Sequence, residues 1–158
     1  MKGYNAKQLA KAGLIAAIYA GVTLATAGFS FGPTQLRVAE SMTLLPLLFP
    51  EAVPGLFVGC FLANLIGGYG LADAVVGSLA TLAAALLTKR CKGPVMGGLP
   101  PVAINAVAIG ILLKAVGAAE AVLPLVMLQL AAEEAVSVYL FGLPLMGLMK
   151  RLPGPRDQ

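Results

Sequence analysis

Long stretches without any charged side chain constrain the fold of this chain more than any other feature of its sequence. Uncharged, mostly apolar runs cover 12–36, 52–72, 74–88, 93–113 and 135–149. A helix that crosses a bilayer needs about 20 residues of this kind. Charged residues make up only 11% of the chain, against about a quarter in ordinary soluble domains. The sequence therefore predicts an all-α integral membrane protein and argues against a soluble or a disordered chain.

Turn residues divide the chain into six predicted transmembrane helices within one membrane domain, residues 1–158. The predicted segments are 8–29, 36–50, 52–68, 71–89, 98–117 and 121–149. Glycine and proline, which favour turns, mark the boundaries, as at Gly32-Pro33 and Pro100-Pro101. The segment 36–50 is the least regular of the six, because Arg37 and Glu40 lie in it and Pro46 interrupts it.

Lysine and arginine predict the orientation of these segments. Most basic residues lie near the start of the first segment, the end of the fourth or the end of the sixth: Lys2, Lys7, Lys11, Lys89, Arg90, Lys92, Lys150, Arg151 and Arg156. With six helices and cytoplasmic N- and C-termini, only Arg37 and Lys114 lie outside, as the positive-inside rule requires. The net charge of +4 then reflects topology, and no nucleic-acid partner is expected. A cleaved signal peptide ending near Ala27 is the alternative for the first segment.

Polar side chains inside the predicted segments are candidates for a ligand site. An ionisable group in the bilayer costs roughly 2.5–3.5 kcal/mol on insertion scales, so it is expected to face a cavity or a partner. The candidates are Arg37, Glu40, Asn64, Asp73, Asn105, Lys114, Gln129, Glu133 and Glu134. Gln129 and Glu133 share a helix face, and Glu134 lies about 100° around the helix from Glu133. Pairing that only fixes helix packing is the alternative for each of them.

Small residues form two adjacent ridges along the first predicted helix. The ridges consist of Ala12, Ala16 and Ala20, and of Gly13, Ala17 and Gly21. A face of this kind lets another helix approach closely. The spacing fits internal packing and docking to a partner protein equally well, so both interpretations stay open at this point.

Absent residue types and motifs narrow the function further. The chain has no histidine, and Cys60 and Cys91 lie far apart, so neither a metal site nor a cofactor is predicted. No G-x-x-x-x-G-K-[ST] loop occurs, so the chain is not expected to hydrolyse ATP. Zinc-protease and nucleophile-elbow motifs are also absent, which argues against an enzyme. The pattern favours a membrane subunit that binds a small polar solute and relies on partners for energy.

Five segments, in order along nearly the whole chain, carry a resemblance to a known family. They are 31–46 (FGPTQLRVAESMTLLP), 54–68 (PGLFVGCFLANLIGG), 73–80 (DAVVGSLA), 100–106 (PPVAINA) and 134–144 (EAVSVYLFGLP). The most specific is the run of Gln35, Arg37 and Glu40 followed by Thr43-Leu44-Leu45-Pro46. The chain resembles the substrate-binding (S) components of energy-coupling factor (ECF) transporters, and among them the QueT-type family for queuosine precursors.

The resemblance implies a six-helix S component in the bacterial cytoplasmic membrane, with a pocket that opens to the outside. It implies a transmembrane T component and two cytoplasmic ATPase subunits as partners, and it identifies Ala12, Ala16 and Ala20 as the docking motif. The implied substrate is a 7-deazaguanine, either an aminomethyl or cyano queuosine precursor or queuine. The residues expected to bind it are Gln35, Arg37, Glu40, Asn64, Tyr69, Asn105, Glu133 and Glu134.

The chemistry of a guanine edge agrees with these residue types. A carboxylate accepts two parallel hydrogen bonds from N1–H and N2–H₂, and an arginine or amide donates to O6. The family pattern favours Glu134 over Glu133, because the E-x₇-G-x-P run ends at Gly142 and Pro144. Three alternatives remain: an S component for thiamine, biotin or folate, a structural subunit without a ligand, and a small membrane enzyme. In the structural subunit, Arg37, Glu40 and Glu134 would pair only with each other.

Overall fold

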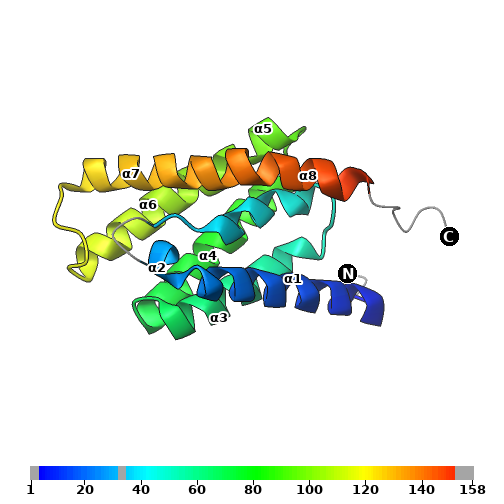
Figure 1. The fold of residues 1–158 in the computed structure, drawn as a ribbon, viewed down its shortest axis with the longest axis horizontal. Coiled ribbons are helices and arrows are strands. Elements are labelled where there is room, and N and C mark those ends of the chain that lie inside the picture. The colour runs from blue at the N-terminus through cyan, green and yellow to red at the C-terminus, as the bar shows by residue number, and fades with distance from the viewer. Residues whose placement is uncertain (1–3, 32–34, 152–158) are drawn as a thin grey trace.

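The structure is a computed structural model that describes residues 4–31 and 35–151. Within these residues it contains helices and no strand, so the all-α prediction is confirmed. The elongated helices run roughly along the long axis of the molecule, and the beginning of α1 and the end of α8 lie at the same end (Figure 1). The predicted turn at Gly32-Pro33 and the basic residues Lys2 and Arg156 lie outside the described residues.

Ten helical elements follow one another along the described part of the chain. They are α1 (Ala6–Ala25), α2 (Ala27–Ser30), η1 (Val38–Leu47), α3 (Ala52–Gly67), α4 (Leu71–Thr88), α5 (Pro94–Gly97), α6 (Leu99–Ala115), α7 (Leu123–Ala135), η2 (Val136–Phe141) and α8 (Gly142–Arg151). Each predicted segment therefore coincides with helical structure to within a few residues. The first contains α1 and α2, and the last contains α7, η2 and α8 in succession.

Four helical stretches within the described residues are long and apolar enough to cross a bilayer. These stretches are Ala6–Ala25, Leu71–Thr88, Pro94–Ala115 and Leu123–Arg151. Two further apolar elements, η1 and α3, are shorter. The 16 residues of α3 span about 24 Å, somewhat less than the hydrocarbon thickness of about 30 Å. Six membrane crossings, with both termini in the cytoplasm, stay a prediction.

Small residues bring α1 and α3 into close contact. A Cβ atom added at Gly55 would lie 2.8 Å from the Ala12 carbonyl oxygen, and one added at Gly59 would lie 2.8 Å from that of Ala16. Ala12 and Ala16 are themselves buried. The alanine ridge of α1 therefore meets a G-x-x-x-G pair on α3, a type of packing in which backbones approach without intervening side chains.

The interior of the molecule is occupied by η1, a ten-residue 3₁₀ helix. All residues from Ala39 to Pro46 are buried, and η1 contacts α1, α3, α4, α5, α8 and η2. A helix surrounded by other helices does not need to present an amphipathic face. Burial on every side explains how Arg37 and Glu40 are tolerated in the predicted segment 36–50, because the surrounding helices separate them from lipid.

A short π-helix, η2, interrupts the last long helix between Glu134 and Pro144. Proline has no N–H to donate to the carbonyl four residues before it, so Pro144 favours a local change in the hydrogen-bond pattern. The next element, α8, approaches η1 closely at Gly142. A Cβ atom added there would lie 2.9 Å from the Ser41 carbonyl oxygen. This glycine therefore allows the end of the chain to pack against η1.

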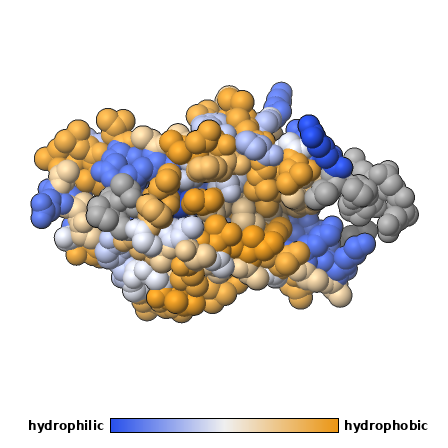
Figure 2. All heavy atoms as spheres, in the orientation of Figure 1, coloured by the Kyte–Doolittle hydropathy of each residue, from blue (hydrophilic) through white to orange (hydrophobic). Residues whose placement is uncertain are grey.

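The exterior is largely apolar. Figure 2 shows hydrophobic side chains along the middle of the visible face and hydrophilic ones gathered mostly toward its two ends. Large side chains such as Leu14, Ile66, Leu128 and Leu140 are more than half exposed. A soluble protein rarely carries so many exposed large apolar residues, whereas lipid tails accept them. The surface is therefore that of a protein embedded in a membrane.

Candidate functional site

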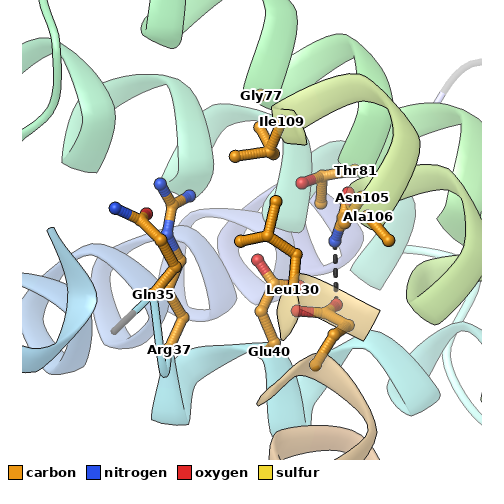
Figure 3. A pocket seen from close by; sticks show the side chains of 10 residues that line it. Gln35, Arg37, Glu40, Gly77, Thr81, Asn105, Ala106, Ile109 and Leu130 are labelled. Atoms are coloured by element: carbon orange, nitrogen blue, oxygen red, sulfur yellow. Dashed lines mark hydrogen bonds between the residues drawn. The ribbon is translucent and has the colours of Figure 1, made fainter. Parts of the chain in front are cut away.

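A polar cavity lies between η1, α4, α6 and α7, and we call it the inner cavity. Its walls consist of Gln35, Arg37, Glu40, Gly77, Thr81, Asn105, Ala106, Ile109, Leu130 and Glu134. Figure 3 shows Gln35, Arg37 and Glu40 on one side and Thr81, Asn105 and Ala106 on the other. The cavity has a volume of about 20 Å³, which accommodates roughly one water molecule.

Arg37 brings positive charge to the inner cavity. Its Nη2 atom lies 3.8 Å from Oδ2 of Asp73, near the start of α4, and both side chains are buried. Its Nε donates to the Ser30 carbonyl oxygen at 3.4 Å, and the guanidinium carbon lies 5.1 Å from the centre of the Phe31 ring. These contacts hold the guanidinium between η1, the end of α2 and the start of α4.

Glu40 is the most deeply buried acidic side chain of the inner cavity, with 1% of its surface exposed. Its Oε1 atom accepts a hydrogen bond from the hydroxyl of Tyr19, a fully buried residue of α1. Its Oε2 atom has no hydrogen-bond partner among the described residues. A buried carboxylate oxygen of this kind retains capacity for a hydrogen-bond donor from a ligand.

Glu134 and Asn105 form a hydrogen-bonded pair across the cavity, between α7 and α6. Asn105 Nδ2 donates to Glu134 Oε1 at 2.8 Å, a bond drawn as the dashed line from Asn105 in Figure 3, and both side chains are buried. Asn105 Oδ1 has no hydrogen-bond partner among the described residues. The Glu40 carboxyl group lines the same small cavity. Two acidic groups and one amide thus line the same small cavity.

A second cavity, the outer cavity, lies beside the inner one and has a volume of about 190 Å³. Its lining includes Tyr69, Glu120 and Gln129. Gln35 and Leu130 line both cavities, so these two side chains form the boundary between them. The loop between α6 and α7 contributes 118–121 to the lining, which places the outer cavity at the end of the molecule opposite the chain termini (Figure 1).

Five of the eight residues predicted to bind substrate line the inner cavity. They are Gln35, Arg37, Glu40, Asn105 and Glu134. Tyr69 lines the outer cavity instead, with its hydroxyl 3.4 Å from the Phe31 carbonyl oxygen. The structure thus brings most of the predicted residues together, although they come from three separate parts of the chain.

Asn64 and Glu133 lie outside the lining of both cavities. Asn64 is fully buried, and its Nδ2 donates to the Asp73 carbonyl oxygen at 3.1 Å. This bond joins the end of α3 to the start of α4. Glu133 Oε2 accepts from the Gln35 backbone N–H at 2.9 Å, and its Oε1 accepts from Gln129 at 2.9 Å. Both residues therefore support segments that line the cavities.

The predicted docking residues differ in their exposure. Ala12 and Ala16 pack against α3 and are 7% and 5% exposed, whereas Ala20 is half-buried. Internal packing therefore accounts for the small side chains at 12 and 16. The neighbouring ridge of Gly13, Ala17 and Gly21 is exposed along its whole length. Docking through α1 stays a prediction, and this second ridge is the part of it that faces outward.

Sequence reasoning missed the roles of several residues around the cavity. Tyr19 was not identified, because one tyrosine in an apolar helix resembles any other buried aromatic residue. Asp73 was recognised as an ionisable residue in a predicted span, but its pairing with Arg37 depends on the tertiary fold. Gly77 lines the cavity, and a Cβ atom there would lie 2.3 Å from Asn64 Nδ2, so a side chain at this position would collide with Asn64. Two opposite charges in otherwise apolar segments were the only signal for the Arg37–Asp73 pair.

The side chains of the inner cavity include both donors and acceptors of hydrogen bonds. Carboxylate oxygens accept from N–H groups, and the guanidinium and amide groups donate to carbonyl oxygens. In the described part of the chain, no three His, Cys, Asp or Glu side chains are grouped closely enough to hold a metal ion. The inner cavity thus combines hydrogen-bond donors and acceptors in one buried space.

Comparison with known proteins identifies the family. The family model described as QueT transporter matches residues 9–151, nearly the whole chain. Neither a curated protein nor a solved structure matches the chain. The matched region contains every helix that lines the two cavities, together with nearly all of α1. From the apolar helices, the polar cavity and this match, we conclude that the chain is a multi-pass membrane protein with a role in transport and belongs to the QueT transporter family.

Proposed function

We propose that the chain is the substrate-binding S component of an ECF-type importer and that it takes up a 7-deazaguanine precursor of queuosine. Membership of the QueT transporter family supports a substrate of this class. The absence of a nucleotide-binding loop from the sequence supports an importer energised by separate ATPase subunits. The protein then resides in the bacterial cytoplasmic membrane, with the outer cavity toward the exterior.

The arrangement of Glu134, Asn105 and Glu40 is the observation that carries the proposal. A guanine-type edge presents N1–H and N2–H₂ side by side, and one carboxylate can accept both bonds. The Asn105 amide lies next to the Glu134 carboxylate, at 2.8 Å, and it can donate its second N–H to O6. A site that buries such groups strongly rejects analogues that leave them unpaired. The wall of the inner cavity therefore suits a guanine ring.

Ligand binding requires the inner cavity to enlarge. A volume of about 20 Å³ holds roughly one water molecule, and a two-ring base is much larger. The adjacent outer cavity supplies about 190 Å³ and is separated from the inner one by Gln35 and Leu130. Displacement of these two side chains would join the cavities. We propose this route for entry of the base from the exterior.

The proposed partners are a transmembrane T component and two ATPase subunits, with α1 as the docking helix. The exposed ridge of Gly13, Ala17 and Gly21 and the half-buried Ala20 supply a surface without bulky side chains. Replacement of Ala17 by leucine is expected to weaken co-purification with the T component while ligand binding persists. The matched control is Leu14→Ala, which changes an exposed α1 residue outside both ridges.

Thermal stabilisation of the purified protein in detergent tests the proposed substrate. The panel contains aminomethyl- and cyano-deazaguanine, queuine, guanine, thiamine, riboflavin and biotin. A ligand at about a hundred times its dissociation constant adds about 2.7 kcal/mol to a reversible two-state protein. Stabilisation by a deazaguanine and not by the vitamins is the expected result. Stabilisation by a vitamin alone would contradict the substrate and retain the S-component assignment.

The alternative function, a structural subunit without a ligand, predicts different partners for the buried polar groups. It requires Arg37, Glu40 and Glu134 to satisfy one another. Each of them also has a partner outside this group: Arg37 pairs with Asp73, Glu40 with Tyr19 and Glu134 with Asn105. Acceptors also remain on Glu40 and Asn105 after these bonds are counted. These unpartnered atoms favour a ligand site over a purely structural cluster.

A further inference from the structure

The charges around the inner cavity are unequal in number. In the described part of the chain, Arg37 is the sole basic side chain among the cavity-lining residues, and Glu40 and Glu134 are the acidic ones. Arg37 also forms an ion pair with Asp73, which lies just behind the cavity wall. One cation therefore lies near three carboxyl groups, and its ion pair with Asp73 already neutralises part of its charge.

The remaining polar partners of the two glutamates are neutral. Glu40 Oε1 accepts from the Tyr19 hydroxyl, and Glu134 Oε1 accepts from the Asn105 amide. Both carboxyl groups line the same cavity of about 20 Å³, so they lie close together. Neighbouring carboxylates repel each other when both are ionised, and the repulsion is strong in a cavity shielded from water. A positive charge placed between them would remove this repulsion.

The two glutamates differ in the hydrogen-bonding groups that they present to a ligand. Glu134 is held beside an amide, and the two together match the donor and acceptor pattern of a guanine edge. Glu40 lies deeper, and its Oε2 atom has no hydrogen-bond partner among the described residues. A single unpartnered carboxylate oxygen is a good acceptor for an ammonium group. The geometry therefore assigns the ring to Glu134 and leaves Glu40 for a cationic substituent.

On the basis of the proposed function, we infer that the site selects a 7-deazaguanine whose 7-substituent is a cationic amine, and that Glu40 binds the ammonium group. The aminomethyl compound meets this requirement, because its amine is protonated at neutral pH. The cyano compound has the same ring and a neutral substituent that cannot donate a hydrogen bond. Arg37 then stays with Asp73 and completes the charge balance of the site.

Calorimetric titration of the wild-type protein with three ligands of identical ring structure tests the selection. The ligands are aminomethyl-, hydroxymethyl- and cyano-deazaguanine, of which only the first carries a charge. The aminomethyl compound is expected to bind at least about tenfold more tightly than the other two, since hydrogen bonds to charged groups are the stronger ones. This comparison needs no variant, so impaired folding cannot affect it.

Two isosteric variants test the assignment of the two glutamates. In Glu40→Gln the preference for the aminomethyl over the hydroxymethyl compound is expected to fall to about twofold or less, because the charge that selects the cation is gone. In Glu134→Gln both ligands are expected to lose affinity in parallel, with their ratio retained. Arg90→Gln, at an exposed charged residue just after α4 that lines neither cavity, is the control and is expected to change neither value.

The outcomes distinguish this inference from the proposed function on which it rests. Equal or tighter binding of the cyano compound to the wild type would overturn the cation selection and leave a deazaguanine transporter intact. An unchanged ligand ratio in folded Glu40→Gln would overturn the role of Glu40. Failure of all three ligands to bind the folded wild-type protein would overturn the substrate class itself, and the inference with it.

Discussion

Two interfaces inside this protein are built on opposite principles. Between α1 and α3, alanine and glycine allow the backbones to touch, and a Cβ atom added at Gly59 would lie 2.8 Å from the Ala16 carbonyl oxygen. Around the inner cavity, between η1, α4, α6 and α7, polar side chains are buried and several of their atoms lack partners. The first interface has no room to change, whereas the second has unused hydrogen-bonding capacity. We infer that one holds the bundle together and the other binds the ligand.

The largest expected effect is at the close-packed interface. Gly59→Leu would drive a side chain into the Ala16 backbone and the Tyr19 side chain, both within 3.1 Å of the added Cβ atom. Overpacking typically costs 1–3 kcal/mol and more where backbone blocks the new atoms, so we expect a loss of about 3 kcal/mol or more. Denaturant unfolding in detergent measures it.

A matched glycine on the same pair of helices provides the control. Gly21 lies on the exposed ridge of α1, and a Cβ atom added there would meet no other atom within 4 Å. Gly21→Leu is therefore expected to change the free energy of unfolding by less than about 1 kcal/mol. Equal destabilisation by the two substitutions would show that the α1–α3 contact is not the tighter interface.

The second effect tests the buried ion pair at the edge of the cavity. Asp73→Asn keeps the shape of the side chain and its ability to accept from the Tyr69 backbone N–H, but it leaves Arg37 without its carboxylate. Removing one partner of a buried pair costs about 3–5 kcal/mol, so we expect destabilisation of about 3 kcal/mol. The double variant Arg37→Met/Asp73→Asn should recover part of this loss in the same unfolding measurement. An additive double variant would mean that the two residues do not interact.

The same contrast explains how much of the molecule could be predicted from the sequence. Apolar runs and turn residues predicted six helical segments, because a chain in lipid must satisfy its backbone hydrogen bonds within helices. The small-residue ridge at Ala12 and Ala16 predicted a close approach, but its spacing could not identify α3 as the partner. The 3₁₀ conformation of η1 could not be predicted from the sequence either, since it depends on the helices that surround it.

The candidate site was predictable to a similar degree. Arg37, Glu40, Asn105 and Glu134 stood out because polar residues in apolar segments need a cavity or a partner, and all four line the inner cavity. Asn64 stood out for the same reason and instead joins α3 to α4 through the Asp73 carbonyl oxygen. Residue type reveals that a polar group must be satisfied. Only the packing of the helices decides whether a ligand or the chain itself satisfies it.

The third effect tests the link between the two interfaces. Tyr19 lies on α1 between Ala16 and Ala20, and its hydroxyl donates to Glu40 in the cavity wall. Tyr19→Phe would leave Glu40 Oε1 without a buried donor, which costs about 1–2 kcal/mol of unfolding free energy. We also expect severalfold weaker binding of the aminomethyl compound, because Glu40 would lose an atom that orients it. Calorimetry measures the binding. The control is Tyr4→Phe, a substitution at an exposed tyrosine just before α1, which is expected to leave binding unchanged.

The smallest effect separates two adjacent glutamates that the sequence left undecided. Glu134 lines the inner cavity, whereas Glu133 accepts from the Gln35 backbone N–H at 2.9 Å and lines neither cavity. Glutamine at 133 can still accept that bond through its own carbonyl oxygen, with only the charge assistance lost. Glu133→Gln is therefore expected to weaken ligand binding by less than about threefold, against tenfold or more for Glu134→Gln. If Glu133→Gln weakened binding as much as Glu134→Gln, Glu133 and the Gln35 backbone that it contacts would belong to the binding site.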